Sequence, residues 1–270
     1  MSQKKKILAS IIIVNYNNAK YLKISVKSAI NQNYKNKEII VVDDKSEDNS
    51  IDILKSFKKK IILIKNQKKT SVGSYDQINS YYRGFLKAKG KYLFFLDSDD
   101  YFKKNKLKII MKKFISNRNV DIFFDLPILK FSKKIKKKKF KQKKFIISNW
   151  PRFSPQSCIS VKKDYAKEFF KVLKIKKFNS IWFDFRLATY SFLRNGNIQV
   201  IENYLTYYRQ LENSASKKFK TFSKNWWIRR NEAHDYINFL TKKLKIREKF
   251  TLDKIFTKIV NKFFDKKISY

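Results

Sequence analysis

Short apolar runs in the N-terminal part of the chain each stop abruptly at an amide or a carboxylate. The runs cover residues 10–14, 38–42 and 92–96, and they end at Asn15, Asp43 and Asp97. Runs of this length, rich in β-branched and aromatic residues, predict buried strands. Because helical patterns separate them, the strands are expected to lie parallel in a doubly wound sheet, and the sequence predicts an α/β fold.

The segments between these runs carry the helical signals. Leu22, Val26 and Ala29 recur at helical spacing, residues 61–64 give a further strand, and residues 75–89 give the next helix. Parallel strands present their carboxyl ends on one edge of the sheet, where the ligands of such sheets bind. We therefore expect the following side chains to line one cleft: Asn15, Asp43, Asp44, Asp97 and Asp99.

The acidic cluster of Asp97, Asp99 and Asp100 stands in a strongly basic chain, with 64 lysines and arginines against 22 aspartates and glutamates. Carboxylates this close repel one another and raise one another's pKa unless a cation neutralises them, and Mg²⁺ or Mn²⁺ favours such oxygen ligands. The same residues also suit a turn that caps the next helix. The cluster alone leaves a cation site and a turn as open readings.

The chain from Ser10 to about Asp100 resembles the inverting glycosyltransferases of family 2, whose fold is called GT-A. Three motifs carry the resemblance: Asn-Tyr-Asn at 15–17, Val-Asp-Asp-x-Ser at 42–46 and Leu-Asp-Ser-Asp-Asp at 96–100. A weaker similarity continues to about Ser216, through 182–187 and 207–214. It implies a GT-A doubly wound, mostly parallel sheet with flanking helices and a C-terminal helical extension.

The resemblance implies that Asp97 and Asp99 bind a divalent metal, Mn²⁺ or Mg²⁺, that bridges the two phosphates of a nucleotide-diphosphate sugar. Asp99 is the first choice for direct ligation. A metal there would screen the diphosphate and stabilise the charge that develops as the sugar-phosphate bond breaks.

The other donor contacts are also implied by the resemblance. One of Asp43 and Asp44 would accept a hydrogen bond from the nucleotide while the other is structural, and Asp44 could instead cap the following turn through Ser46. Asn15 and Tyr16 would lie against the nucleoside, although plain packing explains an aromatic here nearly as well.

The general base would be Asp184, which is the only acid between residues 178 and 190. An inverting transfer needs a carboxylate that takes the proton of the acceptor hydroxyl. The alternative is an aspartate that caps the helix carrying Leu187 and Tyr190.

Two positions depart from the family pattern. Leu211 stands where many members have a histidine that completes the metal shell, so the third protein ligand is missing or is Glu212. In the segment before the fourth strand, Arg83 could reach a phosphate, since a guanidinium suits that task, or project into solvent.

The formal net charge of +42 invites a nucleic-acid hypothesis. However, the lysines are spread along the chain, and abundant Ile, Asn, Phe and Tyr with few Gly and Pro point to an AT-rich codon bias. The lysines of Lys130 to Lys144 do cluster, and we expect a solvated loop there.

The sole cysteine, Cys158, is expected to be buried, in a reducing compartment.

We expect residues 1–216 to form the catalytic domain and residues 217–270 a helical extension. No apolar run approaches the length that spans a bilayer. A stripe of Leu252, Ile255, Phe256, Ile259, Val260, Phe263 and Phe264 nevertheless predicts an amphipathic helix. Such a helix could lie on an anionic membrane surface or pack on the catalytic domain.

The sequence thus predicts a metal-dependent, inverting glycosyltransferase of surface glycans, in lipopolysaccharide or envelope polysaccharide assembly. Its partners would be a nucleotide-diphosphate sugar and a glycan or lipid-linked acceptor, in the cytoplasm or peripherally on the inner face of the cytoplasmic membrane. A nucleic-acid-binding protein and a non-catalytic, degenerate transferase are the alternatives. A sugar-nucleotide pyrophosphorylase is disfavoured because no glycine lies in Asn15 to Asn18.

Overall fold

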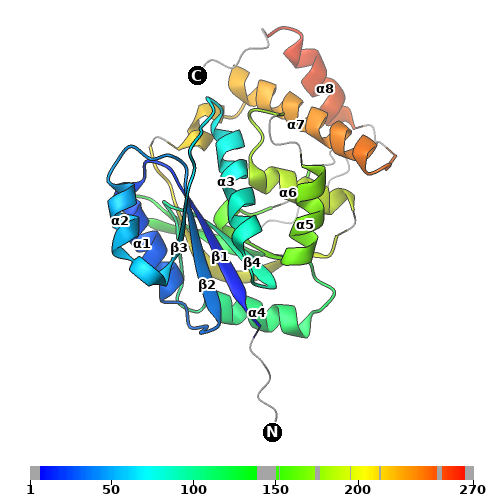
Figure 1. Ribbon diagram of the computed structural model, residues 1–270. Coiled ribbons are helices and arrows are strands. Elements are labelled where there is room, and N and C mark those ends of the chain that lie inside the picture. Colours follow the sequence, from blue (N-terminus) through cyan, green and yellow to red (C-terminus); the bar gives the residue numbers. More distant parts are fainter. Residues whose placement is uncertain are drawn as a thin grey trace.

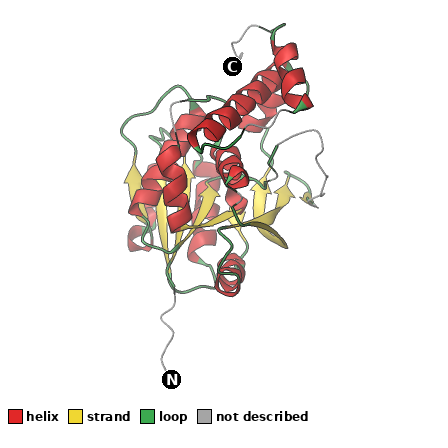
Figure 2. Cartoon of the chain, turned by 90° about the vertical axis from the view of Figure 1, so that its right-hand side faces the viewer, coloured by secondary structure: helices red, strands yellow, loops and turns green. Residues whose placement is uncertain are grey.

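The computed structural model describes residues 7–138, 150–151, 153–173, 177–194, 196–212, 214–247 and 251–264. Within these residues, nine strands form one mixed sheet, and helices cover both of its faces (Figures 1 and 2). The two C-terminal helices lie beyond one end of the sheet, opposite the end where the chain begins (Figure 1).

The first part of the sheet is parallel. Its strands run in the spatial order β3 (Ile62–Lys65), β2 (Lys37–Asp43), β1 (Ala9–Asn15) and β4 (Tyr92–Asp97). Each matches a strand expected from the sequence. The helices that connect these strands are α1 (Ala19–Ile30), α2 (Ser50–Ser56) with the short 3-10 turn Lys58–Lys60, and α3 (Gly73–Lys87).

Beyond β4 the sheet mixes directions. The remaining strands continue in the order β8 (Ile159–Lys162), β6 (Ile122–Lys130), β9 (Ile198–Arg209) and β5 (Tyr101–Phe102), and β7 (Ile135–Lys137) pairs with β6. β4 pairs antiparallel with β8, whereas β6 and β9 are parallel. The remaining helices are α4 (Lys106–Ser116), α5 (Lys163–Val172), α6 (Phe183–Leu193), α7 (Lys224–Lys243) and α8 (Leu252–Asn261), with 3-10 turns at Gln156–Cys158 and Ala215–Phe219.

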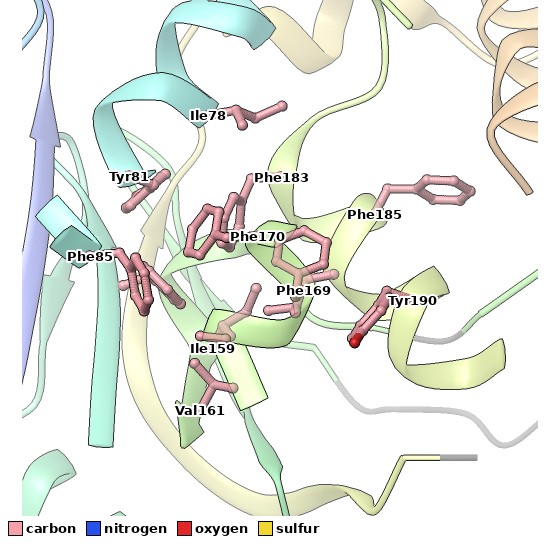
Figure 3. Close-up of a cluster of buried hydrophobic side chains, with 14 of the residues drawn as sticks. Ile78, Tyr81, Phe85, Ile159, Val161, Phe169, Phe170, Phe183, Phe185 and Tyr190 are labelled. Atoms are coloured by element: carbon pink, nitrogen blue, oxygen red, sulfur yellow. The ribbon is translucent and has the colours of Figure 1, made fainter. Parts of the chain in front are cut away.

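Two hydrophobic layers hold the helices on the sheet. Alternate side chains of a strand point to opposite faces. In β1, Ile11 and Ile13 therefore join the layer beneath α1, α2 and α4, while Ile12 and Val14 join the layer beneath α3, α5, α6 and α7. The second layer is dense in aromatic rings, with Tyr81 of α3 beside Phe183 of α6 (Figure 3). The α/β class, the parallel sheet core and the flanking helices are confirmed.

The lysine-rich segment differs in part from the expected loop. Ile135–Lys137 form β7, which pairs antiparallel with β6 through Ile128 and Lys130, although all of its residues are exposed. Strands pair through their backbone groups and need no apolar side chains. The lysine-rich composition therefore gave no signal for this strand. Residues 139–149, which contain the rest of the cluster, lie outside the described residues. Cys158 is buried, as expected.

α7 packs against the body of the protein. Ala233, Ile237 and Leu240 are buried, and Tyr236 joins them in the layer that contains α3 and α6. Nε2 of the buried His234 lies 2.8 Å from Oδ1 of Asp253 in α8. None of the described helices is long and apolar enough to cross a bilayer.

Candidate functional site

A cavity of about 460 Å³ opens at the carboxyl ends of β1, β2 and β4, the edge of the sheet where the sequence predicts the ligand site. Strand ends, helix α3, the N-terminal turn of α6 and helix α7 all contribute to its wall. Of the predicted site residues, these line it: Tyr16, Asp44, Asp97, Asp99 and Asp184. The other three, Asn15, Asp43 and Arg83, do not.

Asp97 ends β4 and is held by helix α3. The hydroxyl of Tyr81 donates a hydrogen bond of 2.7 Å to its Oδ1, and Nε2 of Gln77 donates one of 3.2 Å to the same oxygen. Burial and the charge of Asp99 raise the pKa of Asp97 to about 7. A carboxylate with this pKa is poised to bind a cation, because a positive charge would restore its ionised form.

The acidic cluster divides into a cavity part and a structural part. Asp99 lines the cavity, and burial raises its pKa while the nearby Arg209 cation opposes that shift. Asp100 is fully buried, and it accepts hydrogen bonds from Oγ of Ser157 at 2.6 Å and from the backbone N–H of Arg209 at 2.8 Å. Asp100 is thus committed to hydrogen bonds within the fold, whereas Asp99 faces the cavity. Neither of them caps α4, whose N-cap residue is Asn105.

Asp43 and Asp44 also differ in their positions, since Asp44 lines the cavity and Asp43 does not. Asp43 accepts hydrogen bonds from the backbone N–H and the Oγ of Ser46, at 2.9 and 2.7 Å, so it is Asp43 that caps the turn after β2. The alternative reading, in which Asp44 caps this turn through Ser46, is wrong. Asp44 faces the cavity, where burial raises its pKa and the nearby Asp76 charge adds to that rise, while hydrogen bonds from Asn66 and Ser80 oppose it.

Asn15 and Arg83 are turned away from the cavity. The amide of Asn15 donates 2.7 Å to Oδ1 of Asp43 and thereby ties the ends of β1 and β2 together. The guanidinium of Arg83 donates to the side-chain oxygen of Asn66, whose amide in turn donates 2.6 Å to Asp44. Neither of the readings offered for Arg83, a phosphate contact or a free solvent position, describes this arrangement.

Tyr16 lies at the mouth of the cavity and is 42% exposed. The ammonium of Lys69, which also lines the cavity, lies over its ring. An exposed aromatic face beside a cation is suited to a planar base or a sugar that stacks on it.

Asp184 stands in the first turn of α6, on the cavity wall with Trp182 and with Arg229 of α7. The backbone N–H of Phe185 donates 2.7 Å to its Oδ1. Burial raises the pKa of Asp184, and the positive charge of Arg229 opposes the rise. The charge of Asp184 in turn contributes to the raised pKa of Asp97, so the two carboxylates share one electrostatic environment.

A third protein ligand for a metal is not supplied by the predicted alternative. Leu211 faces the cavity, as its alignment with the histidine position predicts, whereas Glu212 is exposed and lies outside the lining. Across the ranges that the structure describes, no three His, Cys, Asp or Glu side chains gather as a metal-binding group. Asp97 and Asp99 nevertheless both line the cavity.

Sequence reasoning missed Tyr81, Gln77 and Arg229. Tyr81 and Gln77 lie one helical turn apart on α3, so their shared face could have been recognised once Asp97 was suspected. No local signal marked Arg229, because α7 reaches the cavity only through its packing on α6.

Comparison with protein families gives a match to the model described as "Glycosyl transferase family 2", over residues 10–181. WfaP of Escherichia coli, named UDP-Glc:alpha-D-GlcNAc-diphosphoundecaprenol beta-1,3-glucosyltransferase, is 44% identical over 103 residues, or 37% of this chain and 38% of WfaP. The minor teichoic acid biosynthesis protein GgaA of Bacillus subtilis is 34% identical over 122 residues, or 42% of this chain and 26% of GgaA. The matched stretch thus spans well under half of either relative.

Among solved structures, S. aureus TarS in complex with UDP superimposes with a TM-score of 0.63 at 15% identity, over 95% of this chain and 70% of that chain. The mannosyltransferase PcManGT of Pyrobaculum calidifontis, in complex with GDP-Man and Mn²⁺, superimposes with a TM-score of 0.56 at 11% identity, over 94% of this chain and 70% of that chain. At these identities the similarity establishes the fold, which is the GT-A fold that the resemblance implies.

Proposed function

This chain belongs to glycosyl transferase family 2, and we propose that it moves one sugar from a nucleotide-diphosphate-sugar donor to a hydroxyl of a growing surface glycan. One observation carries the proposal: the acidic pair of Asp97 and Asp99 and the separate carboxylate of Asp184 face one cavity from different walls. This arrangement offers a diphosphate site and a base side by side.

The donor would lie along the ends of β1, β2 and β4. Asp44 and Tyr16 would contact the nucleoside, because both line the cavity and Asp44 is oriented by Asn66 at 2.6 Å. Asn15, Asp43 and Arg83 would support these contacts from behind, through the hydrogen bonds that fix the ends of β1 and β2.

Asp97 and Asp99 fit a divalent cation. Burial raises the pKa values of both residues, and the charge of Asp99 raises that of Asp97 further. A bound cation would therefore stabilise the ionised carboxylates, which this environment otherwise disfavours. Mg²⁺ is commonly held by one or two carboxylates together with substrate phosphates and water, so Leu211 is compatible with binding. A bound Mg²⁺ or Mn²⁺ would supply neutralisation of the charge on the diphosphate.

Asp184 would act as the general base. It would take the proton of the acceptor hydroxyl while the acceptor oxygen bonds to the anomeric carbon, the bond from that carbon to the donor phosphate breaks, and the nucleoside diphosphate leaves. A single attack opposite the leaving group inverts the anomeric configuration. Trp182, beside Asp184 in the wall, offers an indole on which an acceptor sugar could stack.

The proposed setting is the assembly of lipopolysaccharide or another envelope polysaccharide, at the cytoplasmic face of the membrane. It is supported by the name of WfaP, which specifies a diphosphoundecaprenol-linked sugar, and by that of GgaA, which specifies teichoic acid. The proposed catalytic unit is 1–216, with 217–270 as an extension whose helix α7 contributes Arg229 to the cavity.

The test is a thermal-shift panel of UDP, GDP, dTDP and CMP, with and without Mn²⁺. A ligand that binds the native state raises its apparent stability. We expect one nucleoside diphosphate to give a metal-dependent shift that Asp99→Asn abolishes and that Asp52→Asn, an exposed site on α2, retains. No shift with any nucleotide, together with a salt-sensitive shift on adding DNA or RNA, would instead favour the nucleic-acid alternative.

Donor turnover separates an enzyme from a degenerate transferase. With the nucleotide identified, we expect slow hydrolysis of the matching nucleotide sugar, which water can support without a known acceptor. Nucleotide binding without hydrolysis, and without transfer to lipid-linked glycan extracts, would identify a non-catalytic homologue.

A further inference from the structure

Helix α8 exposes its apolar side chains. Leu252, Ile255, Phe256 and Ile259 are 70%, 46%, 57% and 49% exposed, and Phe263 just after the helix is 83% exposed. The sequence predicts this stripe, and the ordinary place for such a stripe is against a core. No described part of the chain covers it.

The polar side of α8 faces the protein instead. Lys254 and Thr257 are buried, and Nζ of Lys254 donates 2.9 Å to Oδ1 of Asn238 on α7. An ion pair of 2.6 Å joins Arg230 of α7 to Asp253. α8 is thus attached to α7 by hydrogen bonds and ion pairs, and its orientation is the reverse of that of a normal surface helix.

The exposed face extends onto the start of α7. The ring of Phe256 packs at 5.6 Å from that of Trp227, which packs at 4.6 Å from Trp226. The ring of Phe222 in turn packs at 5.3 Å from Trp226, in a tilted arrangement. Phe222 is 72% exposed and has a φ of 66°, an unfavourable conformation for a bulky residue. The apolar surface therefore continues from α8 across the rings of Phe222, Trp226 and Trp227. We name this combined surface the α8 face.

The charges around the α8 face identify its partner. Lys258 of α8 and Lys262 just after it are exposed, and so are Lys217 and Lys220 just before Phe222. A second copy of a chain with a formal charge of +42 would bring like charges together. An anionic bilayer offers both negative headgroups for the lysines and acyl chains for the aromatic and aliphatic side chains.

We infer that the α8 face docks on an anionic phospholipid membrane, with α8 lying in the plane of the interface. Both views place α7 and α8 at one end of the molecule, beyond the sheet (Figures 1 and 2). α7 links this surface to the cavity, since Arg229 lines the cavity while the neighbouring Arg230 pairs with α8. Docking therefore brings the cavity close to the membrane surface. This inference stands on the α8 face and does not depend on the chemistry in the cavity.

The test is co-sedimentation of the full chain with vesicles of phosphatidylglycerol and phosphatidylcholine, against vesicles of phosphatidylcholine alone. The test variant is L252S/I259S/F263S. Its matched control is I24S/L86S/I115S, which removes aliphatic side chains of 48%, 62% and 51% exposure from α1, α3 and α4. We expect binding to the anionic vesicles only, a loss of at least about tenfold in the test variant, and no comparable loss in the control.

Three results would overturn the inference: no vesicle binding by the unmodified protein, equal losses in both triple variants, or a dimer in solution that the test variant dissolves while vesicle binding is absent. Thermal unfolding of both variants checks that they are folded. The nucleotide thermal shift, measured on the same samples, is expected to survive in both. Loss of that shift in every sample would argue against the proposed donor site and leave the vesicle result intact.

Discussion

The hydroxyl of Tyr81 donates a hydrogen bond of 2.7 Å to Oδ1 of Asp97, from a ring that is fully buried between α3 and the sheet. That ring packs at 5.1 Å from Phe95 and at 5.2 Å from Phe183. Figure 3 shows Tyr81 beside Phe183. Burial and the Asp97 charge raise the pKa of Tyr81 well above its usual range, so the hydroxyl keeps its proton and remains a donor. The aromatic core thus fixes one carboxylate of the proposed metal site.

Tyr81→Phe removes this hydrogen bond and keeps the packing. A hydrogen bond to a charged group contributes about 1.5–3 kcal/mol, so we expect roughly tenfold or more weaker binding of the nucleotide with Mn²⁺. Calorimetric titration measures the affinity, and Tyr82→Phe, on the same helix, is the control. An unchanged affinity in Tyr81→Phe would mean that Asp97 is held adequately without it.

Asp184→Asn tests the proposed base. Loss of a general base costs typically about 10²–10⁴ in rate, whereas Asp184 has no proposed contact with the nucleotide. We expect turnover to fall by that factor at an unchanged nucleotide affinity. The exposed Asp164 of α5 provides the control Asp164→Asn. A parallel loss of nucleotide binding would instead assign Asp184 to the donor site.

Arg229→Met tests the charge next to that base. A base acts in its ionised form, so activity falls as the pH falls through its pKa. Burial raises the pKa of Asp184, and the Arg229 cation keeps the rise smaller than it would otherwise be. Removing that cation raises the pKa further, so the acidic limb of the turnover profile should move to higher pH. Arg230→Met, which removes the pair with Asp253 and the contacts with the rings of Trp150 and Trp226, should leave the limb in place.

The sequence predicted which strands end at the site but not which side chains enter it. Asn15 and Asp43 are partners in the register of β1 and β2, and both turn inward, while Asp44, one residue later, faces the cavity. Successive side chains of an extended chain point to opposite faces of the sheet. Because the sequence does not locate a strand end to within one residue, it cannot tell which side chain faces the cavity. Asp97 and Asp99 could be located because they belong to one contiguous motif, and Asp184 because it is the only acid between residues 178 and 190.

Long-range packing explains the rest of what the sequence could not show. Arg229 enters the cavity wall because α7 packs on α6, a contact between distant segments with no local pattern. The spacing of the apolar residues predicted the amphipathic helix α8. It did not predict which face of the helix packs against the rest of the protein. That choice follows from the polar bonds of Lys254 and Asp253 to α7.

Lys106 and Asp125 form an ion pair of 2.6 Å in which both side chains are fully buried. Nζ of Lys106 also donates 2.7 Å to the carbonyl of Ser157, whose Oγ holds Asp100 behind the acidic pair. Lys106→Met leaves Asp125 buried without its partner, so we expect a loss of about 3–5 kcal/mol in the free energy of unfolding. Urea unfolding measures it, and Lys106→Met/Asp125→Leu should cost less than the single change. An equal cost would show that the network matters beyond the ion pair.

Gly84 lets α3 approach β1 closely. A Cβ at this position would overlap Cγ2 of Ile12 and lie 3.4 Å from Cγ2 of Val42, and both partners belong to the packed layer of the sheet. Alanine ordinarily favours a helix over glycine, by roughly 0.5–1 kcal/mol, but overpacking a core costs about 1–3 kcal/mol, so Gly84→Ala should destabilise the protein. Gly73→Ala on the same helix meets only Trp182 at 3.5 Å and should be tolerated. Because the clash is with one methyl group, Ile12→Ala combined with Gly84→Ala should cost less than the sum of the two changes, and strict additivity in thermal unfolding would contradict this account.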